Sequence, residues 1–266
     1  MKILITGGNG NLAKVVAEKL AEKSISFVTC SSKPKVGQIF FDLHSELNEK
    51  IYNEITHIFH FATSPSYEVT NTEIQFLHFA AKAKINLIYF GSTSSYLKDK
   101  TNYGQYKKLI EDKIIELGGI VVTCGLIYGK DFNGQISKIR KILSYLPFSI
   151  VLQNSKQIYL TPSSRIVQTL FEIIDSKNPV SGRYLLFQKP AILLNDLLFS
   201  LSKFKSIKLK VPYKFIRLLF STRLITSKYF IFDRAKSVYS DFSEDLMNNV
   251  VDQTFKVSNW QDELQR

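Results

Sequence analysis

Short apolar runs alternate with helix-period patterns over the first half of the chain. Runs with the length and β-branched or aromatic content of strands occupy residues 2–6, 26–30, 38–41, 57–61, 87–90 and 120–124. Between them, apolar positions recur with the spacing of a helix face at residues 12–23, 72–84 and 102–117. Strands that alternate with helices predict right-handed crossovers and a parallel sheet covered on both faces. We therefore expect a doubly wound α/β fold.

The alternation loosens after residue 130. Helical patterns cover residues 135–145 and 163–175, two short strand candidates lie within 149–160, a further one lies at 183–187, and more helices precede a polar tail. No linker rich in Pro, Gly or Ser separates the two halves. The sequence predicts a first domain over residues 1–130 and a mixed C-terminal region over residues 131–266 that packs directly on it.

A glycine-rich loop, TGGNGNLA, follows the first strand and opens the first helix. Gly7 and Gly10 hold the first two places of a GxxGxxG loop, and Ala13 holds the third. Such glycines permit a tight turn and a close backbone approach to a pyrophosphate, while the helix N-terminus offers amide donors. The loop predicts a Rossmann-type dinucleotide-binding domain. The loop residues expected to contact the cofactor are Gly7, Asn9, Gly10, Asn11 and Leu12.

The end of the second strand bears on which dinucleotide is bound. NAD-binding folds usually place an Asp or Glu there to hold the ribose 2′-hydroxyl. This chain has Ser31, Ser32 and Lys33 instead, and their hydroxyls and cation suit a 2′-phosphate. We expect NADP(H) to be favoured, with NAD(H) as the alternative.

The spacing GxxG, with Asn9 and Asn11 inside the loop, is similar to that of the short-chain dehydrogenase/reductase superfamily. The stretch IFFDL resembles the family's strand that ends in Asp and an aliphatic residue, which implies that Asp42 and Leu43 lie at the adenine. The stretch THIFHFAT resembles the "HxAA" strand end of the extended branch. This resemblance implies that the cofactor is lined by Phe61, Ala62 and Thr63, with His60 as a structural residue.

Two later stretches resemble the family in the same order along the chain. LIYFGSTSSYL resembles "SSxxVYG", in which a catalytic Ser or Thr lies four residues before the tyrosine; here these are Ser92 and Tyr96. VTCGLIYGKD resembles "RPGxxYGP", the element that passes the nicotinamide, which implies cofactor contacts from Leu126 and Ile127. The chain departs from the family pattern at Thr123, Cys124 and Lys130, and at Thr161-Pro162-Ser163, where an acidic "VDD" is common. The separation between Ser92 and Tyr103 is also short for the extended branch.

The stretch SYLKDKTNYGQYKK contains two pairs of a tyrosine and a lysine four residues later. The first pair, Tyr96 and Lys100, belongs to the strand-end motif and a polar connection. Asn102 is a suitable N-cap, so the second pair, Tyr103 and Lys107, lies in the first turns of a helix.

The resemblance implies that Ser92, Tyr103 and Lys107 are the catalytic set. Lys107 would hold the nicotinamide ribose and help the phenol of Tyr103 to exchange a proton, while Ser92 would orient the substrate oxygen. Thr93 and Ser94 come next in the chain and are expected to touch the substrate.

The resemblance to the extended branch implies an enzyme that acts on nucleotide-linked sugars. Dehydratases usually carry Asp-Glu after the catalytic Thr, whereas this chain has Thr93-Ser94. We therefore expect an NAD(P)-dependent reductase of a 4-keto, 6-deoxy nucleotide sugar used for surface polysaccharide. The alternatives are a 4-epimerase with tightly held NAD and a non-catalytic NAD(P)-binding regulatory protein.

The charge balance is basic, with 35 Lys and Arg against 23 Asp and Glu and a formal net charge of +12. Residues 203–228 alone carry eight Lys or Arg and no acidic residue. Such a segment could face a sugar diphosphate, contact an anionic membrane, or be a solvated basic helix face. Aromatic residues do not interleave with the cations as in nucleic-acid modules, so a nucleic-acid partner is not expected.

Cysteine and histidine usage argues against a metal site. Cys30 and Cys124 each end an apolar run and are expected to be buried free thiols, and the four histidines have no metal-ligand spacing. The apolar runs are shorter than a membrane span, and the N-terminus lacks the apolar core of a signal peptide, so we expect a cytoplasmic protein. The resemblance also implies a homodimer.

Overall fold

The computed structural model describes residues 1–130, 132–153, 155–176, 179–204 and 207–211, together with residues 242, 243 and 246. Seven parallel strands form the central sheet in the order β11-β6-β5-β4-β1-β2-β3. These strands are β1 (Lys2–Thr6), β2 (Ser26–Ser31), β3 (Ile39–Phe40), β4 (His57–His60), β5 (Asn86–Ser92), β6 (Ile120–Cys124) and β11 (Gly182–Leu186). The predicted doubly wound α/β fold is confirmed.

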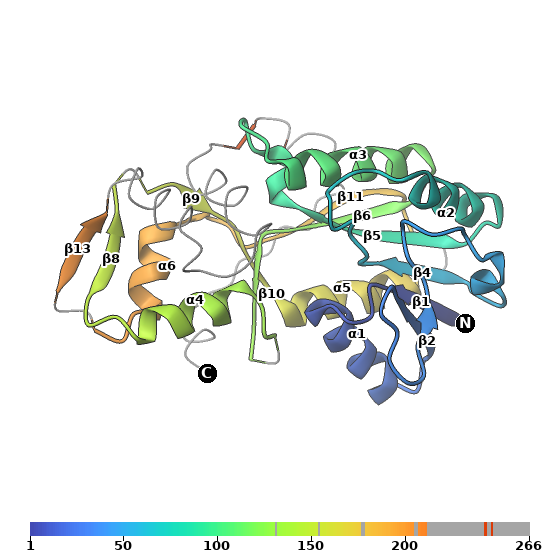
Figure 1. Cartoon of the computed structure of the whole chain (residues 1–266), viewed down its shortest axis with the longest axis horizontal. Helices are drawn as coiled ribbons and strands as arrows, with labels where there is room; N and C mark the ends of the chain where they lie inside the picture. The colour runs from blue at the N-terminus through green and yellow to red at the C-terminus, as the bar shows by residue number, and fades with distance from the viewer. Residues whose placement is uncertain are drawn as a thin grey trace.

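Helices cover both faces of this sheet, as Figure 1 shows. On one face α1 (Asn11–Glu22) and α5 (Ser163–Asp175) pack on Ile3, Ile5 and Val122 of the strands. On the other face α2 (Asn71–Lys82) and α3 (Asn102–Glu116) pack on Leu4, Ile58 and Val121. Because side chains alternate across a strand, consecutive residues of β1 and β6 enter different cores.

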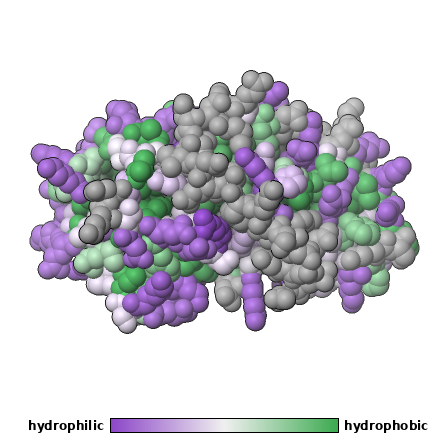
Figure 2. Space-filling model, turned by 180° about the vertical axis from the view of Figure 1, so that it is seen from behind, coloured by the Kyte–Doolittle hydropathy of each residue, from purple (hydrophilic) through white to green (hydrophobic). Residues whose placement is uncertain are grey.

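Polar residues cover much of one face of the molecule. Figure 2 shows hydrophilic residues over much of the visible face, with hydrophobic residues gathered in smaller patches between them.

Cys30 and Cys124 are buried and not bonded to one another, as expected. Among the described residues, no group of His, Cys, Asp and Glu is arranged to hold a metal ion. Within the same residues, none of the helices is both long and apolar enough to cross a bilayer.

Most of the predicted elements of the first half are present, with ends that differ by one or two residues. One local detail was wrong: the N-cap of α3 is Thr101, whose hydroxyl accepts a hydrogen bond from the N–H of Gly104, and Asn102 is already helical. Thr and Asn are both good N-caps, so the pattern alone could not separate neighbouring candidates. Strand β7 (Leu126–Tyr128), which pairs with β10 (Leu160–Pro162), was not predicted as a strand.

The second half forms a smaller body with its own core. Helices α4 (Gln135–Ser144) and α6 (Leu194–Leu201) pack beside a parallel pair, β8 (Ser149–Leu152) and β13 (Lys208–Val211). A second, antiparallel pair joins β9 (Gln157–Ile158) to β12 (Ile192–Leu193). Short 3₁₀ turns, η1 (Glu49–Tyr52) and η2 (Thr93–Tyr96), complete the described elements.

Two elements of the larger body come from the second half of the chain. Helix α5 and strand β11, which pairs with β6, both come from beyond residue 130. The central sheet therefore contains strands from both predicted regions. The division into a domain over residues 1–130 and a C-terminal region over residues 131–266 stays a prediction. Most of the predicted basic segment 203–228 and the helices expected there lie outside the described residues.

Candidate functional site

The glycine loop packs directly on the end of β4. Gly7 has a φ of 65°, and a Cβ placed on it would lie 2.9 Å from the backbone nitrogen of Ala62. The N–H of Gly10 donates to the carbonyl of Gly7 at 2.8 Å, which closes the turn. Only glycine fits the first position, because a side chain would be strained by the backbone conformation and would push into residues 61 and 62.

The N-terminus of helix α1 lies at this loop. Gly10 is its N-cap, no side chain of the described residues caps it, and its first turn contains no acidic residue. The first N–H groups of an α-helix have no partner inside the helix, and the helix dipole adds partial positive charge there. The loop thus fits a diphosphate, since the N-terminus of α1 has no capping side chain among the described residues and no carboxylate in its first turn.

The end of β2 differs from the expectation in one respect. Asn9 donates from Nδ2 to the Oγ of Ser31 at 2.8 Å and to the carbonyl of Lys33 at 2.7 Å. The Oγ of Ser31 also accepts from the N–H of Lys33 at 3.2 Å, and Ser31 is buried. Ser31 therefore holds the glycine loop in place, and only Ser32 and Lys33 are exposed to meet a ribose phosphate.

Other predicted cofactor residues lie at the same carboxyl edge of the sheet. Asp42 is half-buried and its Oδ1 accepts from the N–H of His44 at 3.1 Å, while Leu43 is buried in a core. The ring of Phe61 stacks on Phe90 with centroids 4.0 Å apart. The side chain of Asn11 donates to the backbone carbonyl of Asn133. The half-buried residues at this edge that remain candidates for cofactor contact are Leu12, Ala62, Thr63, Leu126 and Ile127.

Helix α3 meets the loop after β5 in a backbone contact. A Cβ at Gly104 would lie 2.4 Å from the carbonyl oxygen of Ser94, so this glycine lets the first turn of α3 reach η2. The loop is itself ordered by Ser92, whose Oγ accepts from the N–H of Ser94 at 3.2 Å. The contact brings the first turn of α3, which carries Tyr103, against Thr93 and Ser94.

Lys107 is the most perturbed cation of the site. It is almost fully buried, its Nζ donates to the carbonyl of Phe90 at 3.0 Å, and it lies 5.9 Å from the ring centre of Tyr103. Burial lowers the pKa of Lys107 to about 8, against the opposing effect of the Glu111 and Glu73 carboxylates. Tyr103 is half-buried and its ring meets that of Tyr67 edge-on, with centroids 5.3 Å apart.

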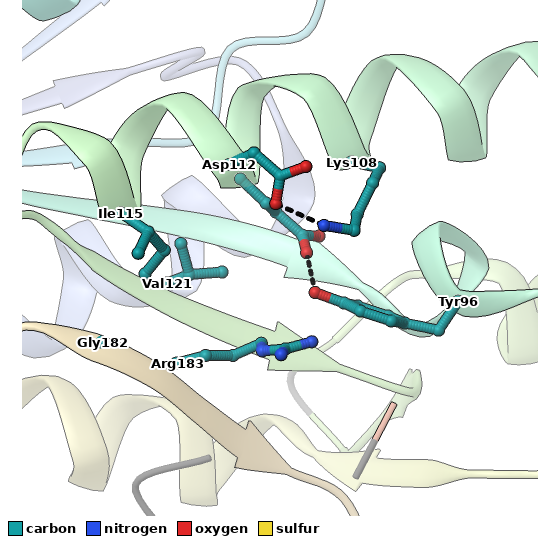
Figure 3. Close-up of a pocket in the computed structure, with 8 residues that line it drawn as sticks. Tyr96, Lys108, Asp112, Ile115, Val121, Gly182 and Arg183 are labelled. Carbon is teal, nitrogen blue, oxygen red and sulfur yellow. Dashed lines mark hydrogen bonds and ion pairs between the residues drawn. The ribbon is translucent and has the colours of Figure 1, made fainter. Parts of the chain in front are cut away.

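Tyr96, the tyrosine of the first pair, has a different environment. Its hydroxyl donates to the Oε2 of Glu111 at 2.6 Å, and burial together with this carboxylate raises its pKa. Figure 3 shows it in a cavity of about 230 Å³ between α3 and strands β6 and β11, with Arg183 below its ring and the Lys108–Asp112 ion pair above. A phenol whose oxygen is held by a carboxylate in this way is poorly placed to exchange a proton with a ligand.

Glu111 was not among the predicted site residues. Its carboxylate accepts hydrogen bonds from the N–H of Ser92 at 3.1 Å and the hydroxyl of Ser95 at 2.8 Å, besides that of Tyr96. A Cβ on Gly91 would lie 2.5 Å from its Oε1, so that glycine makes room for it. A sequence signal exists: Glu111 lies four residues after Lys107 and next to buried Ile110, on the apolar face of α3.

Comparison with solved structures identifies the fold at this point. A structure of MoeE5 in complex with UDP-glucuronic acid and NAD has a TM-score of 0.66 and 15% identity, covering 100% of this chain and 93% of that one. The UDP-glucose 4-epimerase of Thermus thermophilus in complex with NAD has a TM-score of 0.59 and 14% identity, covering 80% of this chain and 86% of that one.

A short-chain dehydrogenase/reductase superfamily protein from Agrobacterium tumefaciens with bound NAD also has a TM-score of 0.59, with 13% identity over 80% of this chain and 86% of that one. No family model matches the sequence. No curated protein matches it either. The chain has the Rossmann-like α/β fold of these three proteins, each of which is in complex with NAD.

Gly104→Ala tests the contact between α3 and η2. An alanine inside a helix normally adds about 0.5–1 kcal/mol of stability, but here its Cβ would meet a backbone oxygen that cannot move alone. We expect a net loss of about 1–3 kcal/mol in the free energy of unfolding, measured by urea denaturation. Gln105→Ala, at the exposed neighbouring position, is the control and should change stability by less than about 0.5 kcal/mol.

Lys107→Met tests the cost of the buried ammonium. Because the folded-state pKa of Lys107 is about 8, below its unfolded value, the charge destabilises the fold fully below pH 8, and the penalty falls as pH rises toward 10.5. The variant should be more stable than the wild type at pH 7, by up to roughly 3 kcal/mol. Thermal denaturation should show this gain shrinking between pH 8 and 10; a gain that does not change with pH would contradict the assignment.

Proposed function

We propose that the chain is an NAD(P)-dependent oxidoreductase of the short-chain dehydrogenase/reductase type that acts on a nucleotide-linked sugar. The observation that carries the proposal is the arrangement of Lys107 beside the ring of Tyr103, in a helix whose first turn packs on the loop that starts at Ser92. A buried lysine with a lowered pKa is rarely retained for stability alone, because its burial is costly.

The cofactor site that this proposal requires would be formed largely by backbone groups. The uncapped N-terminus of α1 and the turn at Gly7 and Gly10 would hold the diphosphate, and Phe61 to Thr63 would line the nicotinamide half. Bound there, the dinucleotide would supply or accept the hydride.

Each catalytic residue has a role consistent with its surroundings. Lys107 is buried and would bind the ribose through Nζ while its charge favours the phenolate form of Tyr103. Tyr103 would give a proton to the substrate oxygen or take one from it. Ser92, whose backbone N–H is held by Glu111, would donate from Oγ to that oxygen. Thr93 and Ser94 would contact the sugar.

For the substrate we propose a 4-keto, 6-deoxy nucleotide sugar of surface polysaccharide synthesis. Support comes from the similar structures, two of which carry UDP-sugars or act on UDP-glucose by name. A 4-epimerase with tightly held NAD is the second candidate, because one of the similar structures is a UDP-glucose 4-epimerase in complex with NAD. A non-catalytic regulatory protein would have no use for a buried Lys107 beside Tyr103.

The remaining expectations concern partners and place. A homodimer, a cytoplasmic location and a peripheral membrane contact remain proposals. In the described part of the basic segment, Lys208 and Lys210 are exposed on β13, which supports a contact with an anionic surface such as a membrane or a sugar diphosphate.

Turnover with a panel of TDP- and UDP-linked 4-keto sugars tests the activity. We expect oxidation of NADPH or NADH, followed by absorbance, in the presence of at least one sugar. Tyr103→Phe should lower kcat by about 100-fold or more while cofactor affinity changes little, because only the proton donor is lost. Tyr96→Phe is the matched control and should be much milder; interconversion of 4-epimers without added cofactor would instead favour the epimerase.

The NADP(H) preference is tested at Lys33. Since Ser31 is engaged with Asn9, the preference depends on the exposed Ser32 and Lys33. We expect tighter binding of NADPH than NADH, and Lys33→Ala should weaken NADPH about tenfold and leave NADH nearly unchanged. Lys35→Ala, an exposed lysine of the same turn region, is the control. Tighter binding of NADH by the wild type would show that the chain is an NAD enzyme.

A further inference from the structure

A row of buried polar side chains runs beneath the loop that follows β4. Its members are Thr6 at the end of β1, His60 at the end of β4, Glu73 on α2 and Tyr106 on α3, and each is at most 1% exposed. They come from four separate elements, so the row joins the strand that carries the glycine loop to the helix that carries Tyr103 and Lys107.

The first half of the row runs from the loop through Thr6 and His60 to Glu73. The N–H of Ala62 donates to the Oγ1 of Thr6 at 3.1 Å, and this oxygen lies 2.8 Å from the Nδ1 of His60. If the threonine hydroxyl donates to Nδ1, the imidazole carries its proton on Nε2, which faces the Oε1 of Glu73 at 3.3 Å. Every donor on this side then has an acceptor.

The other end of the row reaches the same loop from α3. The hydroxyl of Tyr106 donates to the Oε1 of Glu73 at 2.6 Å, and its oxygen accepts from the N–H of Ser64 at 3.2 Å. The backbone N–H groups on either side of Thr63 are thus both held by side-chain oxygens, and those two oxygens are connected through His60 and Glu73. The loop is supported at two points by one chain of contacts.

The carboxylate of Glu73, at the centre of the row, is not explained by its contribution to stability. Glu73 is fully buried, and its Oε2 has no hydrogen-bond partner among the described residues. A buried carboxylate is costly unless it is fully satisfied, and an apolar core would avoid that cost. The ring of Tyr89 connects this carboxylate to Lys107: it lies 4.5 Å from the Nζ of Lys107 and 5.6 Å from the ring of His60, which faces Glu73. The charge of Glu73 opposes the deprotonation of Lys107.

We propose that Glu73, with Thr6, His60 and Tyr106, is a positioning brace that fixes the loop of residues 62–64 against the cofactor and supports the charge of Lys107. This inference rests on the proposed dinucleotide binding, but the brace itself can be tested without it. The four residues contact neither the transferred hydride nor the substrate. They act by accepting hydrogen bonds from the N–H groups of Ala62 and Ser64 and through the negative charge of Glu73.

The neighbours of the two charged groups define the expected pH behaviour. Lys107 is faced by Glu73 from α2, by Glu111 and Tyr103 from its own helix, by Tyr89 from β5 and by Cys124 from β6. Glu73 is faced by His60, Tyr106, Tyr89 and Lys107. Removing the charge of Glu73 leaves Glu111 as the remaining carboxylate near Lys107, so the ammonium should deprotonate at lower pH.

The first experiment compares Tyr106→Phe with Tyr89→Phe. Both tyrosines are fully buried, but within the described residues the hydroxyl of Tyr89 has no hydrogen-bond partner, so it is a matched control. In the cofactor-free protein, Tyr106→Phe should speed amide hydrogen exchange at residues 62–64 about tenfold or more, because the N–H of Ser64 loses its acceptor. The dissociation constant of NADH or NADPH should rise by a similar factor, and Tyr89→Phe should change both by less than about twofold.

The second experiment uses Glu73→Gln, whose amide oxygen can still accept from Tyr106 and His60. Dinucleotide affinity at pH 7 should stay within about threefold of the wild type. The wild type should lose affinity as pH rises through the pKa of Lys107, about 8, and the variant should lose it at lower pH. A residue that served packing alone would leave this pH profile in place.

The outcomes separate the brace from the proposed function. Equal hydrogen exchange in Tyr106→Phe and Tyr89→Phe would overturn the brace even if the wild type binds the dinucleotide. Faster exchange only in Tyr106→Phe would show that the brace supports the loop. If the wild type then bound no dinucleotide, the proposed function would be rejected, and with it the role of the brace in positioning the loop against a cofactor. An unshifted pH profile in Glu73→Gln would overturn the link to Lys107.

Discussion

The contact between α3 and the loop after β5 is the constraint on which the rest of the site depends. Glu111 accepts hydrogen bonds from Ser92, Ser95 and Tyr96, and Gly104 lets the start of the same helix touch Ser94. One helix therefore sets both the loop that carries the serine and the Tyr103–Lys107 pair. Both contacts are local to one crossover unit. The loop also meets the second half of the chain, because the N–H of Ser243 donates to the carbonyl of Tyr96 at 2.6 Å.

Buried charge is the second organising feature, and it opposes stability. Lys107 interacts with the carboxylates of Glu111 and Glu73, and burial raises the pKa of Glu111 while lowering that of Lys107. Each group alone would be costly in a core, and mutual attraction offsets only part of that cost. The cluster lies beneath the carboxyl edge of the sheet, where ligands of doubly wound folds bind, and this position is consistent with the catalytic role that we propose for Lys107.

The second half of the chain connects this edge to a separate core. Strand β7 leaves the end of β6 and pairs with β10, and a Cβ on Gly125 would lie 2.2 Å from the carbonyl of Tyr159. From β10 the chain enters α5 and returns to the sheet as β11. The smaller body with α4 and α6 is thereby attached beside β7, whose Leu126 and Ile127 are predicted to contact the cofactor.

The sequence by itself determined what depends on local spacing: the alternating strands and helices, the turn at Gly7 and the helical position of Tyr103 and Lys107. Tertiary structure decided which polar groups meet. Ser31 was expected at a ribose phosphate but binds Asn9, Tyr96 binds Glu111, and β11 joins the sheet from beyond residue 130. Periodicity shows which face of an element is buried, but a buried hydroxyl or carboxylate is satisfied by partners that lie far away in the chain. Those partners are fixed only when the elements pack.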